Sequence, residues 1–113
     1  MLCLGCRARL GVVSDTYAAV DSSSDVDEAI EWQERIDRWP AVAEYKHKMD
    51  RIVGDATPVI DVGAGPGLDA ARTGAIGLDA SLAMARRARS RDVPMVAGDA
   101  HRLPVADLSL IHI

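Results

Sequence analysis

The feature that most constrains this 113-residue sequence is a glycine-rich turn directly after a short apolar run. The run covers residues 59–62, and the turn contains Gly63, Gly65 and Gly67. Because glycine tolerates backbone conformations that other residues avoid, such a segment can turn tightly and let a ligand approach closely. A strand that enters a turn of this kind and continues into a helix is typical of the ligand-binding edge of an open α/β sheet.

Two further apolar runs follow, and each ends in an aspartate. Residues 75–78 lead to Asp79, and residues 94–97 lead to Gly98 and Asp99. Short apolar runs that alternate with helical segments predict parallel strands joined by helical crossovers. The sequence therefore predicts an α/β fold in which the three strand ends meet at one edge of the sheet.

The helices between these strands are short. Only eleven residues separate Gly67 from Asp79, so the first crossover helix is predicted over about 68–73. Ser81 is placed to cap a second helix over about 82–90, which is rich in alanine and arginine. A glycine-rich turn before a helix also directs backbone N–H groups at the turn, which suits a ligand carboxylate.

The region before the first strand predicts two helices. Ser24 and Asp27 resemble a capping box, and we expect the first helix over about 26–39. Pro40 ends this helix and suits the first turn of the next one, which Gly54 ends. Three aromatic side chains of this region are expected to be core and packing residues: Trp32, Trp39 and Tyr45.

Charge and hydropathy argue against two classes of partner. The formal net charge is −4, so direct nucleic-acid binding is not expected. No apolar run approaches the ~20 residues that span a bilayer, and the start of the chain does not resemble a signal peptide, so we expect no membrane partner and a cytoplasmic protein. The clustered arginines are expected to form a solvated helix face: Arg86, Arg87, Arg89 and Arg91.

The two cysteines are spaced as half of a zinc site. Cys3 and Cys6 form a CxxC pair, but a closed tetrahedral site needs two more ligands at suitable spacing. The remaining candidates, His47, His101 and His112, are isolated and distant. We therefore predict no metal site and interpret the pair as incidental.

The aspartates at the second and third strand ends have both ligand-binding and structural interpretations. A carboxylate at the position of Asp79 can accept hydrogen bonds from two ribose hydroxyls, or it can cap the helix that starts near Ser81. Asp99 is placed to meet an adenine amino group, or it simply forms a turn. His101 has no visible partner and is expected to be a surface loop residue rather than a general base.

Dinucleotide binding is the main competing interpretation of the glycine turn. The dinucleotide fingerprint is G-x-G-x-x-G, whereas Gly63, Gly65 and Gly67 give G-x-G-x-G. Leu68 occupies the third fingerprint position, so the spacing counts against a pyrophosphate site.

Three motifs in order resemble the class I (Rossmann-like) S-adenosylmethionine-dependent methyltransferases, most closely the ubiquinone/menaquinone-biosynthesis-like group. Residues 59–67 resemble the first motif of that family. Residues 77–81 with 84–88 resemble the second, and residues 98–104 the third. The resemblance covers about 58–107, and the ordered set is far more specific than any one motif.

The resemblance implies a role for each motif in binding S-adenosyl-L-methionine. Asp61 and residues 63–67 would surround the methionine part, and Asp79 would hold the ribose. Asp99 would meet the adenine amino group, with the backbone N–H of Ala100 near the ring. The residues that the resemblance assigns to the cofactor are Asp61, Gly63, Ala64, Gly65, Gly67, Asp79, Ala80, Asp99 and Ala100.

The implied function is methyl transfer to a small-molecule acceptor, with no catalytic base identifiable. The alternatives are an NAD(P)-dependent oxidoreductase and a non-catalytic S-adenosylmethionine-binding domain. In the sheet order of the family, 3-2-1-4-5-7-6, the first strand is central and its fourth-strand neighbour is missing here. We therefore expect this chain alone to be poorly stable and inactive.

The predicted organisation has three segments. Residues 1–57 form an N-terminal segment with lead-in helices, and residues 58–107 form an incomplete cofactor-binding half that stops after about the third strand. Residues 108–113 match what one reading frame of a widely used sequencing-transposon end encodes. We therefore expect those six residues to be a non-native tail without functional meaning.

Overall fold

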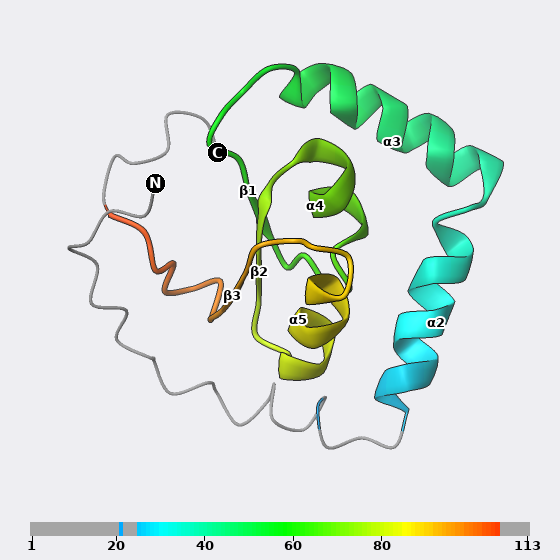
Figure 1. The fold of residues 1–113 in the computed structure, drawn as a ribbon. Helices are drawn as coiled ribbons and strands as arrows, with labels where there is room; N and C mark the ends of the chain where they lie inside the picture. The colour runs from blue at the N-terminus through cyan, green and yellow to red at the C-terminus, as the bar shows by residue number, and fades with distance from the viewer. Residues whose placement is uncertain (1–20, 22–24, 107–113) are drawn as a thin grey trace.

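The computed structural model describes residue 21 and residues 25–106, and these contain a small parallel sheet. Its strands are β1 (Ile60–Val62), β2 (Ile76–Asp79) and β3 (Met95–Ala97), arranged in the order β1-β2-β3 (Figure 1). Both strand pairs are parallel. The predicted α/β arrangement is confirmed, and within the described residues β1 has no strand partner on its second edge.

The two crossover helices lie close to their predicted positions. α4 (Leu68–Thr73) is the short helix that the spacing requires. It lies between two glycines in the left-handed conformation, Gly67 and Gly74, which explains why it begins and ends where it does. α5 (Leu82–Arg89) begins after Ser81, whose hydroxyl accepts a hydrogen bond from the N–H of Met84 at 3.2 Å.

The core beneath the sheet is built from small side chains. Ala70, Ala75, Ala88 and Val93 form the buried cluster. Close approach between the glycine turn and α5 depends on Gly67, because a Cβ at that position would lie 2.6 Å from the Cβ of Ala88. This packing brings the turn before α4 and the body of α5 into one compact layer.

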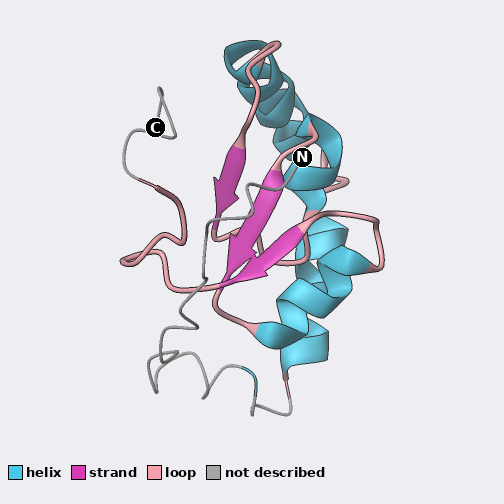
Figure 2. Cartoon of the chain, turned by 60° about the vertical axis from the view of Figure 1, so that its left-hand side comes forward, coloured by secondary structure: helices cyan, strands magenta, loops and turns pink. Residues whose placement is uncertain are grey.

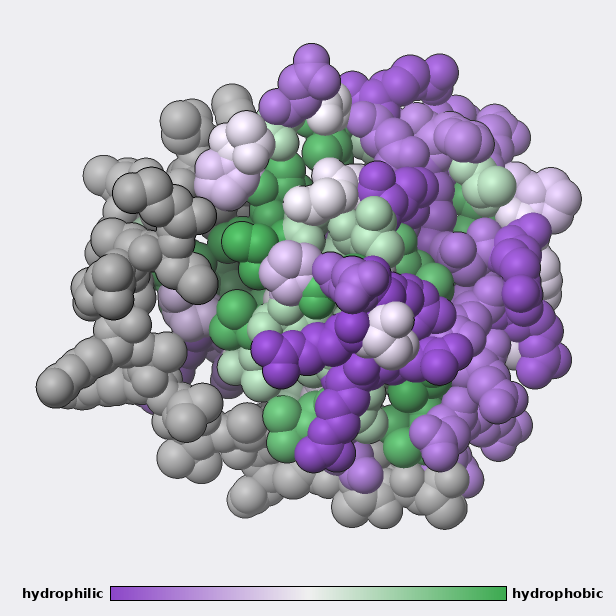
Figure 3. Space-filling view, in the orientation of Figure 1, coloured by the Kyte–Doolittle hydropathy of each residue, from purple (hydrophilic) through white to green (hydrophobic). Residues whose placement is uncertain are grey.

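Two further helices precede the sheet: α2 (Val26–Ile36) and α3 (Pro40–Val53). Figure 1 shows them meeting at an angle around the outside of the layer, and Figure 2 shows all of the drawn helices on one side of the sheet. Hydrophilic side chains gather over α2 and α3 in Figure 3, and apolar ones reach the surface nearer the sheet.

The predicted end of the first lead-in helix was wrong. α2 ends at Ile36, because Trp39 adopts an extended conformation (φ −69°, ψ 136°). A residue before proline is disfavoured in the helical region, so the helix stops before Pro40 rather than continuing to it. The N-cap of α2 is Asp25, without a side-chain capping bond, and Ser24 lies outside the described residues.

The expectation that the aromatic residues lie in the core was also wrong. Trp32 and Trp39 are about half exposed (48% and 50%), and Tyr45 is 61% exposed. The two tryptophans pack edge-to-face on each other, with ring centroids 5.9 Å apart. α3 contributes no buried residue, because its contacts with the α/β layer are largely polar.

Several predictions concern parts of the chain that the structure does not describe. Cys3, Cys6 and residues 108–113 lie outside the described residues. The division of the chain at residue 57 stays a prediction. In the part of the chain that is described, no helix is long and apolar enough to cross a membrane.

Candidate functional site

The glycine-rich turn is tied to the end of β2 by its own backbone. Gly63, Gly65 and Gly67 have φ values of +75°, +53° and +77°, a region that side-chain-bearing residues rarely adopt. The N–H groups of Gly63 and Ala64 both donate to the carbonyl oxygen of Leu78, at 2.8 and 3.0 Å. The three glycines therefore make possible a specific turn that folds back over the neighbouring strand.

Asp79 completes this connection with its side chain. One carboxylate oxygen accepts the N–H of Gly65 at 2.8 Å, and the other accepts the N–H of Ser81 at 2.8 Å. Each carboxylate oxygen can accept a further hydrogen bond. Asp79 thus holds the turn and the start of α5 together, and it retains acceptor capacity for a ligand.

Asp61, in β1, is a half-buried acid close to other charges. Burial raises the pKa of its carboxyl group, and the nearby carboxylates of Asp69 and Asp79 raise it further. Arg72 and Lys46 partly offset this effect. The strand ends therefore concentrate negative charge beside the glycine turn.

The end of β3 lies beside the end of β2, as the sequence predicted. Asp79 pairs with Ala97 in the strand register, and the N–H of Gly98 donates to the carbonyl oxygen of Asp79 at 3.0 Å. Asp99 and Ala100 follow immediately. The topology therefore brings all three motifs to one edge of the sheet.

The carboxylate of Asp99 is bonded to His101, which sequence reasoning had left without a partner. One carboxylate oxygen of Asp99 accepts the N–H of His101 at 2.9 Å and contacts its Nδ1 at 2.8 Å. The backbone hydrogen bond, followed by the ring contact, lowers the pKa of Asp99. The His101 side chain is 83% exposed, which agrees with its predicted place on the surface.

A pocket of about 290 Å³ separates the glycine turn from the lead-in helices. Gly63 and Ala64 belong to one wall, whereas Asp79 and Asp99 do not line it. Gln33 reaches over the turn, with its Oε1 3.0 Å from where a Cβ on Gly65 would lie. The pocket is lined by Gln33, Ile36, Asp37, Val42, Lys46, Gly63, Ala64, Pro66, Leu68 and Asp69.

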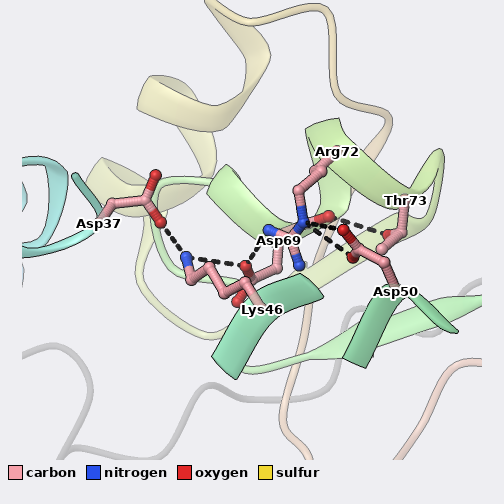
Figure 4. A network of polar contacts seen from close by, with 6 residues as sticks. All are labelled: Asp37, Lys46, Asp50, Asp69, Arg72 and Thr73. Carbon is pink, nitrogen blue, oxygen red and sulfur yellow. Dashed lines mark hydrogen bonds and ion pairs between the residues drawn. The ribbon is translucent and has the colours of Figure 1, made fainter. Parts of the chain in front are cut away.

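One wall of the pocket carries a network of charges (Figure 4). Lys46 pairs with Asp37 and lies 2.8 Å from a carboxylate oxygen of Asp69. Arg72 pairs with Asp69 at 2.5 Å and with Asp50 at 2.8 Å. Although burial opposes it, hydrogen bonding to Arg72 and Lys46 holds the pKa of Asp69 below its usual value.

Sequence reasoning missed the contribution of the lead-in helices to this site. Gln33, Asp37 and Lys46 line the pocket, but none belongs to the three motifs. Lys46 and Asp69 are 23 positions apart, so no local spacing signals their contact.

Three other predicted features lie away from the pocket or differ from expectation. Gly67 packs against α5, where a Cβ on this residue would meet Ala88, and Ala80 is buried. Arg87 and Arg91 do not simply form a solvated face, because both bind Glu34. The described residues contain no group of three side chains that could hold a metal ion.

Comparison with known proteins gives one partial match. The chain is 46% identical over 54 residues to a demethylmenaquinone methyltransferase of Corynebacterium kroppenstedtii. The matched stretch covers 43% of this chain and 24% of the relative. The match therefore spans about a quarter of the length of the relative. No family profile and no solved structure matches.

Proposed function

We propose that the complete protein is an S-adenosylmethionine-dependent methyltransferase whose cofactor site is the glycine turn together with Asp79. The observation that carries this proposal is the hydrogen bond from the N–H of Gly65 to the Asp79 carboxylate, at 2.8 Å. It places an acid with free acceptor capacity beside a turn whose first residue, Gly63, is exposed. The partial similarity to a demethylmenaquinone methyltransferase supports methyl transfer as the chemistry.

The residues present fit such a cofactor on two counts. A Cβ built on Gly63 would have no neighbour within 4 Å, so there is open space beside an exposed stretch of turn backbone. Each Asp79 oxygen already accepts one backbone N–H, and a second acceptor site on each suits the two hydroxyls of a ribose. Asp79 would hold the ribose, and the turn from Gly63 to Gly67 would contact the methionine part.

The chemistry proposed for this site needs little from protein side chains. S-adenosylmethionine, when bound, supplies a methyl group activated on a sulfonium. The turn and Asp79 would bind the cofactor and orient it toward the acceptor. Positioning of this kind is the main contribution that a protein makes to the displacement of a methyl group from a sulfonium. Asp99 and the N–H of Ala100 would contact the adenine, and no residue is assigned as a catalytic base.

The proposed acceptor is a small molecule rather than a nucleic acid. The net charge of −4 does not favour binding to a polyanion. Because the matched relative is named for a demethylmenaquinone, a compound of that class belongs in the first acceptor screen.

Binding and turnover of the complete gene product test this proposal together. Calorimetry should detect binding of S-adenosylhomocysteine but not of NADH. Transfer of a radiolabelled methyl group from S-adenosylmethionine to one of the screened acceptors should follow. Binding of NADH alone would instead favour an oxidoreductase, and cofactor binding without transfer to any acceptor would favour a non-catalytic binding domain.

A further inference from the structure

α2 and α3 contribute almost nothing to the apolar core. Ile30 is the one buried residue of α2, and α3 has none. The buried cluster beneath the sheet, Ala70, Ala75, Ala88 and Val93, includes no residue of either helix. Apolar burial therefore gives these helices little attachment to the α/β layer.

α2 is instead joined to α5 and its C-terminal extension by charge. The carboxylate of Glu34 accepts hydrogen bonds from Arg87 at 2.6 and 3.0 Å and from Arg91 at 2.5 Å. Arg91 also donates to the carbonyl oxygen of Pro66, within the glycine turn, at 3.3 Å. A single carboxylate on α2 is thus connected both to the α5 region and to the turn.

α3 is joined to α4 in the same way. Lys46 lies 2.8 Å from Asp69, and Asp50 lies 2.8 Å from Arg72. Lys46 also pairs with Asp37, just after α2, so the two lead-in helices share a charge contact (Figure 4). The network therefore joins α2, α3 and α4 at one place.

These ion pairs bridge the two walls of the pocket. Gln33, Asp37 and Lys46 come from the lead-in side, and Gly63 and Ala64 come from the turn. We propose that α2 and α3 form a cover over this pocket that is fastened by ion pairs and opens, without unfolding of the sheet, as ionic strength rises. The proposal rests on the proposed function only for the identity of the ligand, because the opening itself involves no ligand.

The physical basis is the different response of the two kinds of contact to salt. Added salt shortens the Debye length from about 30 Å at 0.01 M to about 3 Å at 1 M, which weakens ion pairs near the surface. It does not weaken apolar burial in the same way. A unit held mainly by charge can therefore open separately from a unit held by a core.

Hydrogen exchange of the complete protein, followed by mass spectrometry, tests this proposal. Between about 20 mM and about 500 mM sodium chloride, amides of α2 and α3 should exchange at least about tenfold faster. Amides of β2 should keep their rates. Equal acceleration in α2, α3 and β2, or no acceleration in the two helices, would overturn the proposal.

Two variants and a matched control make the test specific. Glu34→Gln should speed hydrogen exchange in α2 at low salt and should reduce the further acceleration that salt causes. If that variant does not fold, Asp50→Asn should have the same two effects in α3. Glu44→Gln is the control, because among the described residues the ion pair of Glu44 is with Lys48 of the same helix, at 3.1 Å, and does not bridge two elements. If the control accelerates exchange as much as the bridging variants, the proposal fails.

A ligand measurement separates this proposal from the proposed function. S-adenosylhomocysteine should slow exchange in α2 and α3 if the pocket side of the turn binds it. A protein that shows the salt response but does not bind S-adenosylhomocysteine would retain the ion-paired cover and lose the methyltransferase assignment. A protein that binds S-adenosylhomocysteine but shows no salt response would keep the methyltransferase assignment and lose the ion-paired cover.

Discussion

The α/β layer and the lead-in helices are two regions of one chain held together by different forces. In the layer, small side chains form the buried cluster, and Gly67, in the turn against α5, leaves no room for a side chain beside Ala88. In the lead-in region, α3 has no buried residue and makes ion pairs to the layer through Lys46 and Asp50. The first region should therefore be sensitive to volume, and the second to charge.

The candidate site lies where these two regions meet. In the pocket beside the turn, Gly63 and Ala64 belong to the α/β layer, whereas Gln33 and Lys46 belong to the ion-paired helices. A binding site of this kind combines fixed geometry on one side with adjustable access on the other. The following changes test whether the two regions differ as described.

The largest effect is expected at Gly67. In Gly67→Ala, the new Cβ would lie 2.6 Å from the Cβ of Ala88, with φ at +77°. We expect a loss of about 3 kcal/mol in the free energy of unfolding, from overpacking and backbone strain together. Gly74→Ala is the matched control, because its φ is +72° with nothing within 4 Å. It should cost about 1 kcal/mol, from strain alone.

Denaturant unfolding of both variants checks this prediction. Equal losses in the two would mean that backbone conformation alone, and not close packing of the glycine turn on α5, requires glycine at 67. The layer would then not be the tightly packed region that the comparison assumes.

A smaller effect is expected where the two regions meet, at Gly65. Gly65→Val strains a φ of +53° and brings a side chain within 3.0 Å of Gln33. We expect the affinity for S-adenosylhomocysteine to fall more than about thirtyfold, or about 2 kcal/mol, while the fold survives. Gly54→Val shares nearly the same φ, +52°, at the end of α3, and it should leave affinity unchanged. If calorimetry on the two folded variants gave equal affinities for S-adenosylhomocysteine, the prediction would be refuted.

The smallest effect concerns the charge contact of α2. Hydrogen bonds from Arg87 and Arg91 lower the pKa of Glu34 to about 2, from an ordinary value of 4.5. Because the folded-state pKa is depressed, the stabilisation is fully present above pH 4.5 and is lost as pH falls toward about 2. We expect Glu34→Gln to lose about 1 kcal/mol at neutral pH, a value reduced for screening by nearby solvent.

Urea unfolding at a series of pH values tests whether the stabilisation from Glu34 is lost, rather than gained, as the pH falls. The gap between wild type and Glu34→Gln should be constant from neutral pH to about pH 5 and should narrow as the pH falls further. A gap that widens toward acid pH would show that the carboxylate does not gain stability from the two arginines.

Local signals explain why much of the layer could be predicted from sequence. The spacing of glycines limited α4 to residues 68–73, and Ser81 marked the start of α5. The contact of Asp99 with His101 could also have been predicted from sequence, because an aspartate side chain commonly accepts a hydrogen bond from the backbone N–H two positions later. These features depend on neighbours in sequence.

The lead-in region was harder to predict because its contacts are distant in sequence. Glu34 and Arg87 are 53 positions apart, and nothing in either segment selects the other. The tryptophans suggested a core, yet they pair with each other at the surface. The three motifs located the turn and the aspartates, whereas the pocket wall formed by Gln33 and Lys46 emerged only from the folded arrangement.

The most direct test of the central claim is the affinity of the complete protein for S-adenosylhomocysteine in wild type and in Asp79→Ala. Removing the carboxylate that bonds the turn and that we propose to hold the ribose should weaken binding by about 1.5–3 kcal/mol, roughly tenfold to a hundredfold. Asp55→Ala, an exposed acid beyond α3, should bind as wild type does. Calorimetry that gave Asp79→Ala an affinity within about twofold of wild type would contradict the account and remove Asp79 from the site.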